Sequence, residues 1–305
     1  MKNKKLSHNG LQGSVTSVMA ALLCILIGLF VGFLVLLAIN PAHAWADGFV
    51  RILKGGFHDA PYGVGKELAN AAPLIMTGLS VGFAFKTGLF NIGAAGQYTL
   101  GAYGALYCAI MLKLPWFVCL LAAAILGGLW GAIPGFFKAY FNINEVITSI
   151  MFNWIGLYLV NELVYQNGTG PMYDVRNTRT LNLGKNADLA QSVIPDFGLN
   201  KLFQTNSTTI AIFLAAVVAI LIWVVLNKTT FGYELKAVGL NKSAARYAGI
   251  NEKKNIILSM AIAGALAGFG AGLFYLSNVG QWNPLNSTSL PPWRQRHLRC
   301  PAGKL

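Results

Sequence analysis

The sequence predicts an all-α fold, a polytopic bundle of transmembrane helices, and three observations point to it. Of its 305 residues, 55% are hydrophobic and only 11% are charged, whereas a soluble protein carries roughly 25% charged residues. Several apolar runs reach the roughly 20 residues that a helix needs to cross a bilayer, and we expect about seven spans. The 34 glycines fit this class, because glycine is common in membrane helices and lets them approach closely.

The first predicted span is Val15–Ile39, which is much longer than the roughly 7–15 apolar residues of a signal peptide. Lys2, Lys4 and Lys5 precede it, and basic residues favour the cytoplasmic side. We therefore predict a multi-pass protein of the cell membrane with a cytoplasmic N-terminus. The other predicted spans are Ala71–Phe85 (opened by Pro73), Leu89–Leu112, Trp116–Phe137 (ending near Pro134), Glu145–Val164, Thr208–Leu226 and Asn255–Leu276.

Three connecting segments differ in character. Ala44–Phe57 alternates apolar and charged residues, so it is either a short amphipathic helix at the membrane surface or a plain loop. Gln166–Ser207 is polar and rich in Asn, Asp, Gly and Pro, and we predict a long outer loop. Asn227–Lys254 is the most charged segment and falls on the cytoplasmic side of this topology.

The net charge of +13 invites a nucleic-acid role, which we reject. The basic residues are scattered through connecting loops, and excess Lys and Arg in cytoplasmic loops is usual in membrane proteins. Cys24, Cys108 and Cys119 lie inside apolar runs without metal-ligand spacing and are expected to be small core residues. No nucleophile–base pair can be placed at a common depth. We therefore expect no catalytic residue, no metal site and no cofactor.

The stretch Lys86–Gln97 interrupts the helical pattern, and we predict a broken or re-entrant element near residues 86–97. It carries Gly88, Asn91, Gly93 and Gly96-Gln97 between two apolar runs. Irregular backbone at membrane depth is tolerated only where protein or a water-filled cavity covers it, and transport sites use such broken helices. The stretch either lines a substrate path or forms an ordinary tight turn between two spans.

The 227–254 loop has a pattern of two short helices joined at Gly239-Leu-Asn241. Asn241 is a good helix N-cap. The second helix has a face of small residues with Tyr247 and Ile250 beside it. Such a helix either docks into a groove of another protein or is a solvated connection. The small residues are Ala244, Ala245, Ala248 and Gly249.

Three stretches carry a resemblance to a known family. They are G-L-F-N-I-G-A-A-G-Q (88–97), N-E-V-I-T-S-I-M-F-N-W (144–154) and the segment 232–250. They resemble signatures of ABC importer permeases of the branched-chain amino acid, ribose and nucleoside group, and specifically its nucleoside and simple-sugar branch. The third resembles the segment that presses on the ATPase subunit. Ala95 stands where the family usually has Glu.

The resemblance implies a permease subunit of an ATP-driven importer whose favoured small-molecule substrate is a nucleoside. A separate ATP-binding subunit would drive alternating access, and a second permease subunit and an extracellular substrate-binding lipoprotein would complete the assembly in the lipid bilayer. The residues expected to line the substrate path are Asn91, Gly93, Gly96, Gln97, Asn144 and Asn153. For each amide, the alternative is a hydrogen bond between helices. The residues expected to couple to the ATPase are Gly232, Glu234, Ala237, Gly239, Asn241, Ala244, Ala245, Tyr247, Ala248 and Gly249.

The main rival is an ion-coupled secondary transporter. Such carriers place ionisable residues within their spans, but the acids nearest to the predicted spans, Glu145 and Glu162, lie at span ends. A channel would leave the coupling-like loop unexplained, and a membrane enzyme is weaker still, because the sequence has no metal cluster and no nucleophile–base pair at a common depth.

Residues 279–305 depart from the family pattern, so we predict a permease domain over 1–278 and a divergent tail. From Pro292 on, codons read one base out of frame permit H-G-D-N-G-I-S-V-A-L-L-G, which resembles the family's continuation. The tail is therefore either frameshifted or naturally divergent, and sequencing the coding DNA decides between them. In the first case the chain is a truncated permease fragment that does not transport.

Overall fold

The computed structural model describes residues 3–57, 59–278 and 280–283. Contacts within the chain divide it into two units, Met1–Gly63 and Val64–Leu305. Within the described residues, both units are built from helices, and the two strands β1 and β2 have two residues each. The predicted all-α helical fold is confirmed.

The first unit contains one long helix followed by short helical pieces. The long helix contains an apolar stretch, Val18–Ile39, that is long enough to cross a membrane. The rings of Phe33, Trp45 and Phe49 lie with their centroids 5.0 to 5.7 Å apart, and they hold the short pieces against the long helix. The segment 44–57, predicted as either a short helix or a plain loop, is helical and consists of three short helices. The elements are α1 (Asn3–Ile39), α2 (Pro41–His43), the π-helix η1 (Ala44–Phe49), α3 (Val50–Lys54) and η2 (Gly55–Phe57).

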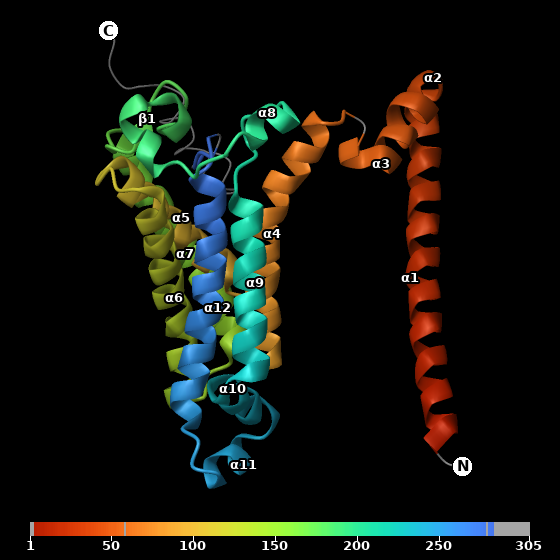
Figure 1. Cartoon of the computed structure of the whole chain (residues 1–305), viewed down its shortest axis with the longest axis vertical. Coiled ribbons are helices and arrows are strands. Elements are labelled where there is room, and N and C mark those ends of the chain that lie inside the picture. The colour runs from red at the N-terminus through yellow and green to blue at the C-terminus, as the bar shows by residue number, and fades with distance from the viewer. Residues whose placement is uncertain (1–2, 58, 279, 284–305) are drawn as a thin grey trace. The chain divides into compact units, whose positions relative to one another are not determined.

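The second unit is a helical bundle (Figure 1). Its helices are α4 (Tyr62–Lys86), α5 (Ala94–Ile110), α6 (Trp116–Phe141), α7 (Glu145–Tyr165), α8 (Leu199–Phe203), α9 (Ala211–Lys228), α10 (Thr230–Leu240), α11 (Lys242–Tyr247) and α12 (Glu252–Tyr275). Among the described helices, α1, α4, α6, α7, α9 and α12 are long and apolar enough to span a membrane. The predicted third span is shorter than expected, because α5 has only 17 residues.

Helix α12 lies at the centre of the bundle and is the most buried of these spans. It packs against α6 and α5 at glycines. A Cβ atom on Gly127 would lie 2.5 Å from the carbonyl oxygen of Gly264, and one on Gly101 would overlap Gly268. Only glycine permits this approach of the backbones, as is common in membrane helix packing.

Two prolines that the sequence places at span boundaries lie inside helices instead. Pro73 is within α4 and Pro134 is within α6, and both are buried. A membrane helix tolerates proline because neighbouring side chains and helices satisfy the freed backbone groups. Helix α4 consequently starts before the predicted Ala71, and α6 continues past Phe137.

The irregular stretch begins where α4 ends. Gly88 has a φ of +73°, and the Leu89 N–H donates to the Ala84 carbonyl at 2.9 Å while the Gly88 N–H donates to Phe85 at 3.2 Å. This pair of bonds is the Schellman motif, which favours glycine at the left-handed position. Helix α5 begins only at Ala94, so Leu89–Gly93, predicted as the start of the third span, is not helical.

The predicted outer loop 166–207 is folded against the end of the bundle. It contains η3 (Gln166–Gly168), β1 (Tyr173–Asp174), β2 (Arg179–Thr180), η4 (Leu183–Lys185), η5 (Ala187–Ser192) and α8. After α12 the chain returns to this region, where the Trp282 backbone N–H donates to the Thr180 hydroxyl at 3.0 Å and the Trp282 indole donates to Asn161 at 2.9 Å.

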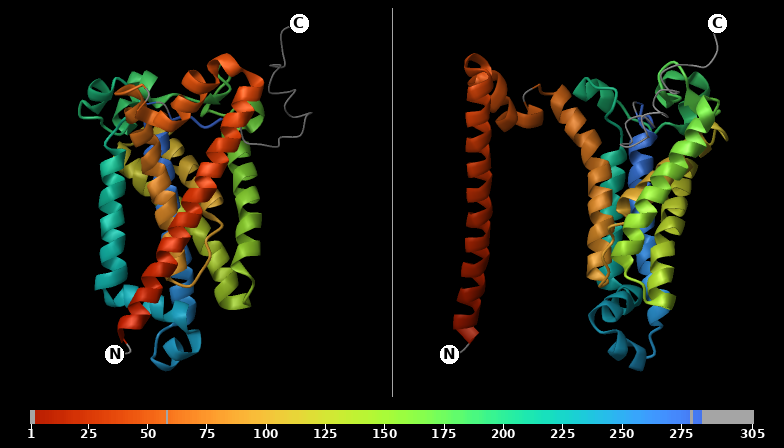
Figure 2. Two further views of the ribbon diagram at one scale, coloured as in Figure 1. Left: turned by 90° about the vertical axis from the view of Figure 1, so that its right-hand side faces the viewer. Right: turned by 180° about the vertical axis from the view of Figure 1, so that it is seen from behind.

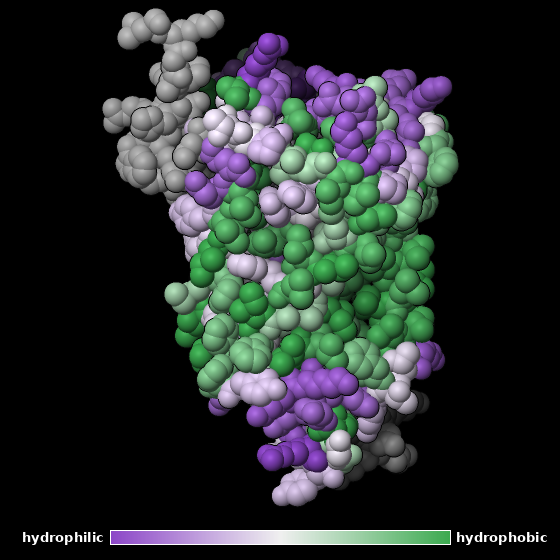
Figure 3. Space-filling model, turned by 90° about the vertical axis from the view of Figure 1, so that its left-hand side faces the viewer, coloured by the Kyte–Doolittle hydropathy of each residue, from purple (hydrophilic) through white to green (hydrophobic). Residues whose placement is uncertain are grey.

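The two ends of the bundle are polar and its middle is apolar. Helices α10 and α11 lie at one end, and the hairpin β1–β2 with α8 lies at the other (Figure 2). The face in Figure 3 carries a hydrophobic band between two hydrophilic ends, as expected of a bilayer-spanning protein. Of the predicted tail 279–305, only 280–283 are described, and the proposed frameshift from Pro292 on lies outside the described residues.

Candidate functional site

Asn91 and Gln97 form a reciprocal amide pair beside the start of α5. The Asn91 Nδ2 donates to Gln97 Oε1 at 2.8 Å, and the Gln97 Nε2 donates to Asn91 Oδ1 at 2.9 Å. Both side chains are buried, at 2% and 1% exposure. The Asn91 Nδ2 also donates to the Ser80 hydroxyl at 3.0 Å, and that hydroxyl donates to the Ala263 carbonyl at 2.6 Å. The pair therefore connects the irregular stretch to α4 and α12.

The N-terminus of α5 is capped from another helix. Gly93 occupies the N-cap position and has no side chain to bond the free N–H groups. The Asn153 side chain of α7 replaces it: its Oδ1 accepts from the Gly96 N–H at 2.8 Å, and its Nδ2 donates to the Ile92 carbonyl at 3.0 Å. A Cβ on Gly96 would lie 2.9 Å from the Asn153 Cα. Glycine at position 96 thus lets α7 approach closely enough to make the cap.

Gly93 also faces polar atoms. A Cβ atom there would lie 3.1 Å from Gln97 Nε2, 3.2 Å from the Ser149 Oγ and 3.3 Å from Asn91 Oδ1. Ser149 was not among the residues predicted for the path. It belongs to the same 144–154 signature as Asn153, but only the fold brings it to Gly93.

A second polar contact fixes the end of α4. The Thr87 hydroxyl bonds the Ser259 hydroxyl of α12 and donates to the Ala84 carbonyl at 2.9 Å. Thr87 and Ser259 are both buried. The polar side chains along this interface are all uncharged: Ser80, Thr87, Asn91, Gln97, Ser149, Asn153 and Ser259.

Asn144 lies apart from this cluster. It is the N-cap of α7, where its Oδ1 accepts from the Val146 N–H at 2.9 Å, and it is exposed. The neighbouring Glu145 forms a 2.7 Å ion pair with Lys138 of α6, which ties α6 and α7 together at their turn. Of the six predicted path residues, the structure brings together Asn91, Gly93, Gly96, Gln97 and Asn153. Ala95, in the first turn of α5, is exposed.

Helices α10 and α11 have the predicted arrangement. The Asn241 Oδ1 accepts from the Ala244 N–H at 3.0 Å, so its predicted role as an N-cap is confirmed. Leu240 and Tyr247 are 89% and 95% exposed, which leaves two large apolar side chains uncovered at the tip. Of the small residues, Ala245 is buried, while Ala244, Ala248 and Gly249 are exposed.

The helix pair contacts the irregular stretch directly. A Cβ on Gly239 of α10 would lie 2.5 Å from the backbone carbon of Thr87, and one on Gly88 would overlap Gly239. The other predicted coupling residues secure α10 to the bundle. Gly232 is buried against Leu226 of α9, Ala237 is half-buried, and Glu234 accepts a 3.5 Å hydrogen bond from the Asn255 amide of α12.

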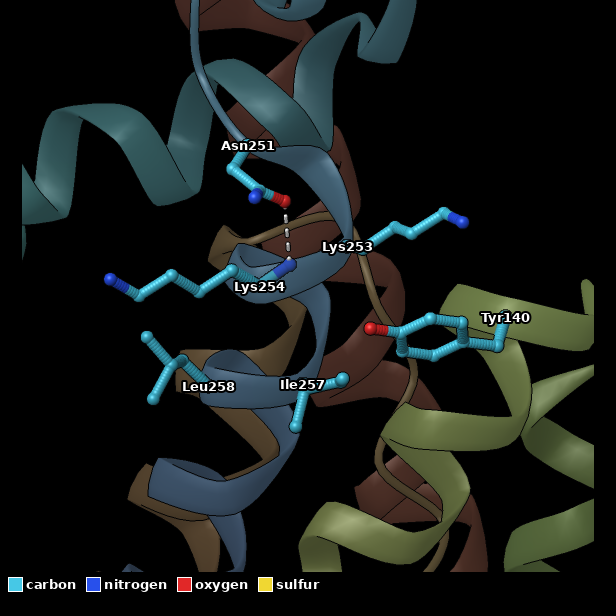
Figure 4. Close-up of a pocket in the computed structure, with 6 residues that line it drawn as sticks. All are labelled: Tyr140, Asn251, Lys253, Lys254, Ile257 and Leu258. Carbon is cyan, nitrogen blue, oxygen red and sulfur yellow. Dashed lines mark hydrogen bonds between the residues drawn. The ribbon is translucent and has the colours of Figure 1, made fainter.

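A cavity of about 330 Å³ lies between α6 and the start of α12 (Figure 4). Its lining residues are Tyr140, Asn251, Lys253, Lys254, Ile257 and Leu258. The Lys253 Nζ lies 4.7 Å from the centroid of the Tyr140 ring, and the Lys254 ammonium extends to the opposite side of α12 (Figure 4). The two ammonium groups do not converge on one ligand position, and the cavity includes none of the predicted path residues. Within the described ranges, no three His, Cys, Asp or Glu side chains lie close enough to hold a metal ion.

Span-length apolar helices around a buried, uncharged polar cluster define a polytopic α-helical membrane protein. The chain belongs to the family described as "Branched-chain amino acid transport system / permease component", which matches residues 65–290. The chain is thus a multi-pass membrane permease component, and the resemblance to ABC transporter permeases of this group is confirmed.

Several similar proteins are permeases of nucleoside and sugar transporters. The guanosine ABC transporter permease protein NupP of Bacillus subtilis is 34% identical over 280 residues, which is 88% of this chain and 72% of that protein. The nucleoside ABC transporter permease protein NupB of Lactococcus lactis is 32% identical over 86% of this chain and 72% of its own length. The glucose ABC transporter permease protein TsgB13 of Haloferax volcanii is 34% identical over 81% of this chain and 65% of its own length. No solved structure matches the chain.

Proposed function

We propose that this chain is the membrane-spanning subunit of an ATP-driven importer of nucleosides. The observation that carries the proposal is the buried Asn91–Gln97 pair, where two amides in a broken helix are bonded to each other in the interior of the bundle. Paired amides of this kind are stable in an apolar surrounding. When the path opens, the same amides can provide hydrogen-bond donors and acceptors to a neutral solute.

The uncharged character of the cluster supports a nucleoside over an amino acid. An amino-acid zwitterion needs charged or strongly dipolar partners when it leaves water, and none of the cluster's side chains ionises. A nucleoside or a sugar is neutral and presents hydroxyl and ring groups that amides and hydroxyls can bond. The names of the relatives NupP and NupB, for guanosine and nucleosides, agree with this choice.

The free energy for transport comes from ATP hydrolysis by a separate ATP-binding subunit, and this chain hydrolyses no ATP itself. The subunit docks on α10 and α11, whose exposed Leu240 and Tyr247 supply apolar anchors for a groove. The proposed topology has α10 and α11 on the cytoplasmic side of the membrane, and it has a cytoplasmic N-terminus. The contact between Gly239 and Thr87-Gly88 then carries motion of α10 to the stretch that holds Asn91.

The full assembly contains a second permease subunit and an extracellular substrate-binding lipoprotein, which meets the opposite end, where β1, β2 and α8 lie. Asn91, Gly93, Gly96, Gln97 and Asn153 line the path between the two ends. Asn144, exposed at the turn before α7, lies at its cytoplasmic mouth.

Competition for uptake tests the substrate. Cells that express this chain with its partners are given a labelled ribonucleoside together with an excess of an unlabelled nucleoside, monosaccharide or branched-chain amino acid. We expect nucleosides alone to suppress uptake strongly. Suppression by the amino acid in place of the nucleosides would contradict the proposed substrate, as would equal uptake in cells that lack this chain.

A further inference from the structure

Ser149 carries a hydroxyl group that the closed bundle leaves unused. Its side chain is fully buried, and its Oγ has no hydrogen-bond partner. Serines in membrane helices commonly bond a carbonyl one turn back, and Thr148 does so through its 2.8 Å bond to the Asn144 carbonyl. A buried polar group without a partner destabilises the fold and calls for an explanation.

Three polar side-chain atoms lie close together beside Gly93. Gly93 has no side chain, and the position that a Cβ would take lies 3.1 to 3.3 Å from Ser149 Oγ, Gln97 Nε2 and Asn91 Oδ1. Gln97 Nε2 donates one of its two hydrogens, to Asn91 Oδ1, and that oxygen accepts one bond of the two it can take. One donor, one acceptor and one hydroxyl with unused hydrogen-bonding capacity therefore lie around the same point of the backbone.

We propose that Ser149, Asn91 and Gln97 form a binding subsite for a single neutral hydroxyl group of the transported solute, a hydroxyl of its sugar ring. The inference rests on the proposed function, since it takes the solute to be a nucleoside. A hydroxyl both donates and accepts, so it fits an arrangement of one acceptor, one donor and one hydroxyl, whereas a carboxylate finds no cation there. The structure has the subsite sealed, and it fills when α7 moves away from the start of α5 during transport.

The test measures uptake by the complete importer, with its ATP-binding subunit and binding protein. Wild type and Ser149→Ala are compared for a labelled ribonucleoside and for its 2′-deoxy, 3′-deoxy and 5′-deoxy analogues. Because both strains use the same binding protein, its own preference cancels when the ratio of ribonucleoside to analogue uptake is compared between strains. We expect Ser149→Ala to lower this ratio about three- to tenfold for the one analogue that lacks the bonded hydroxyl, the effect of one hydrogen bond.

The matched control is Thr148→Val, which removes the neighbouring hydroxyl on the same helix and should leave all ratios unchanged. An unchanged set of ratios in Ser149→Ala, or an equal loss of uptake for every analogue, would overturn the subsite. Absence of nucleoside uptake by the wild type would instead contradict the proposed function.

A second measurement tests the subsite independently of uptake. In a variant without the native cysteines, Ser149→Cys is treated with a small neutral thiol reagent in the complete importer, with and without ATP and ribonucleoside. We expect labelling that requires ATP and that the ribonucleoside slows. A thiol that stays unreactive throughout the ATP cycle would overturn the subsite whatever the uptake shows.

Discussion

Asn153 caps α5 from the neighbouring helix α7. Two bonds, to the Gly96 N–H and the Ile92 carbonyl, satisfy backbone groups that would otherwise face the bundle interior unpaired. We expect Asn153→Ala to lower the free energy of unfolding by about 1–2 kcal/mol, the usual effect of losing a helix cap. The apparent melting temperature of the purified protein in detergent measures this change.

Asn227→Ala is the matched control for that substitution. The Asn227 amide donates to the Trp223 carbonyl within its own helix, and its Oδ1 accepts only an exposed 3.4 Å hydrogen bond from Lys236 of α10, so it caps no helix. Its melting temperature should stay near that of the wild type. An equal loss in the two variants would mean that the cap at α5 contributes nothing specific.

At the residue scale, the sequence identified the amides of the irregular stretch but not what they bond. Asn91 and Gln97 stand out because polar residues in an apolar run are costly unless they have partners. Their pairing with each other, and the approach of Ser149 to Gly93, depend on how α5 and α7 pack. No spacing along the chain encodes that contact. Asn241 was predictable in full, because an N-cap bonds a backbone N–H only three residues ahead.

The contact between α10 and the end of α4 is where we propose that motion of α10 reaches the irregular stretch. Gly239→Ala would drive a methyl group to 2.5 Å from the Thr87 backbone carbon, where backbone cannot yield without moving α10. We expect this variant to keep its place in the membrane and to bind the ATP-binding subunit. It should lose most of the stimulation of ATP hydrolysis by substrate-loaded binding protein, because α10 no longer seats on the irregular stretch.

Gly82→Ala separates this effect from a general effect of adding a methyl group. Gly82 lies in α4 and has nothing within 4 Å of a Cβ placed there, so an alanine adds neither a clash nor backbone strain. Its stimulated ATP hydrolysis should stay close to that of the wild type. Equal stimulation in Gly239→Ala and wild type would show that the contact transmits nothing.

The tip formed by α10 and α11 is expected to hold the partner through Tyr247. This side chain is 95% exposed, and buried aromatic anchors contribute strongly to protein interfaces. Tyr247→Ala should weaken co-purification of the ATP-binding subunit at least tenfold and leave the melting temperature unchanged. Phe197→Ala removes another exposed aromatic ring, in the segment at the opposite end. Loss of the ATP-binding subunit in that control as well would contradict α11 as the docking element.

At the scale of elements, hydrophobic runs predicted the existence of the spans better than their ends. The length of the apolar runs predicted the long helices among the described residues. Helix α4, however, begins at Tyr62 and includes Lys66 and Glu67, which are too polar for a hydropathy pattern to assign to a span. Pro73 and Pro134 lie inside helices, which membrane helices tolerate more readily than soluble ones, so a proline did not mark the end of a span. The late start of α5 at Ala94 was not predicted, since it depends on the cap that α7 supplies.

For the molecule as a whole, the bundle joins a polar, broken element in its interior to the proposed docking surface, α10 and α11, at one end. Secondary transporters take their energy from ions bound at ionisable groups within the spans. In the part of the chain that the structure describes, the polar cluster at α5 consists of amides and hydroxyls, and Glu145 is paired with Lys138 at a helix end. This composition agrees with the proposal that energy enters from outside the bundle, through α10 and α11.

The most direct measurement is uptake of a labelled nucleoside with the ATP-binding subunit intact, deleted, or inactivated in its ATP site, each with and without a protonophore in cells whose ATP level is maintained. We predict that uptake requires this chain and an active ATP-binding subunit, and that it survives the protonophore. Uptake that persists without the ATP-binding subunit and collapses with the proton gradient would contradict the account and identify an ion-coupled carrier.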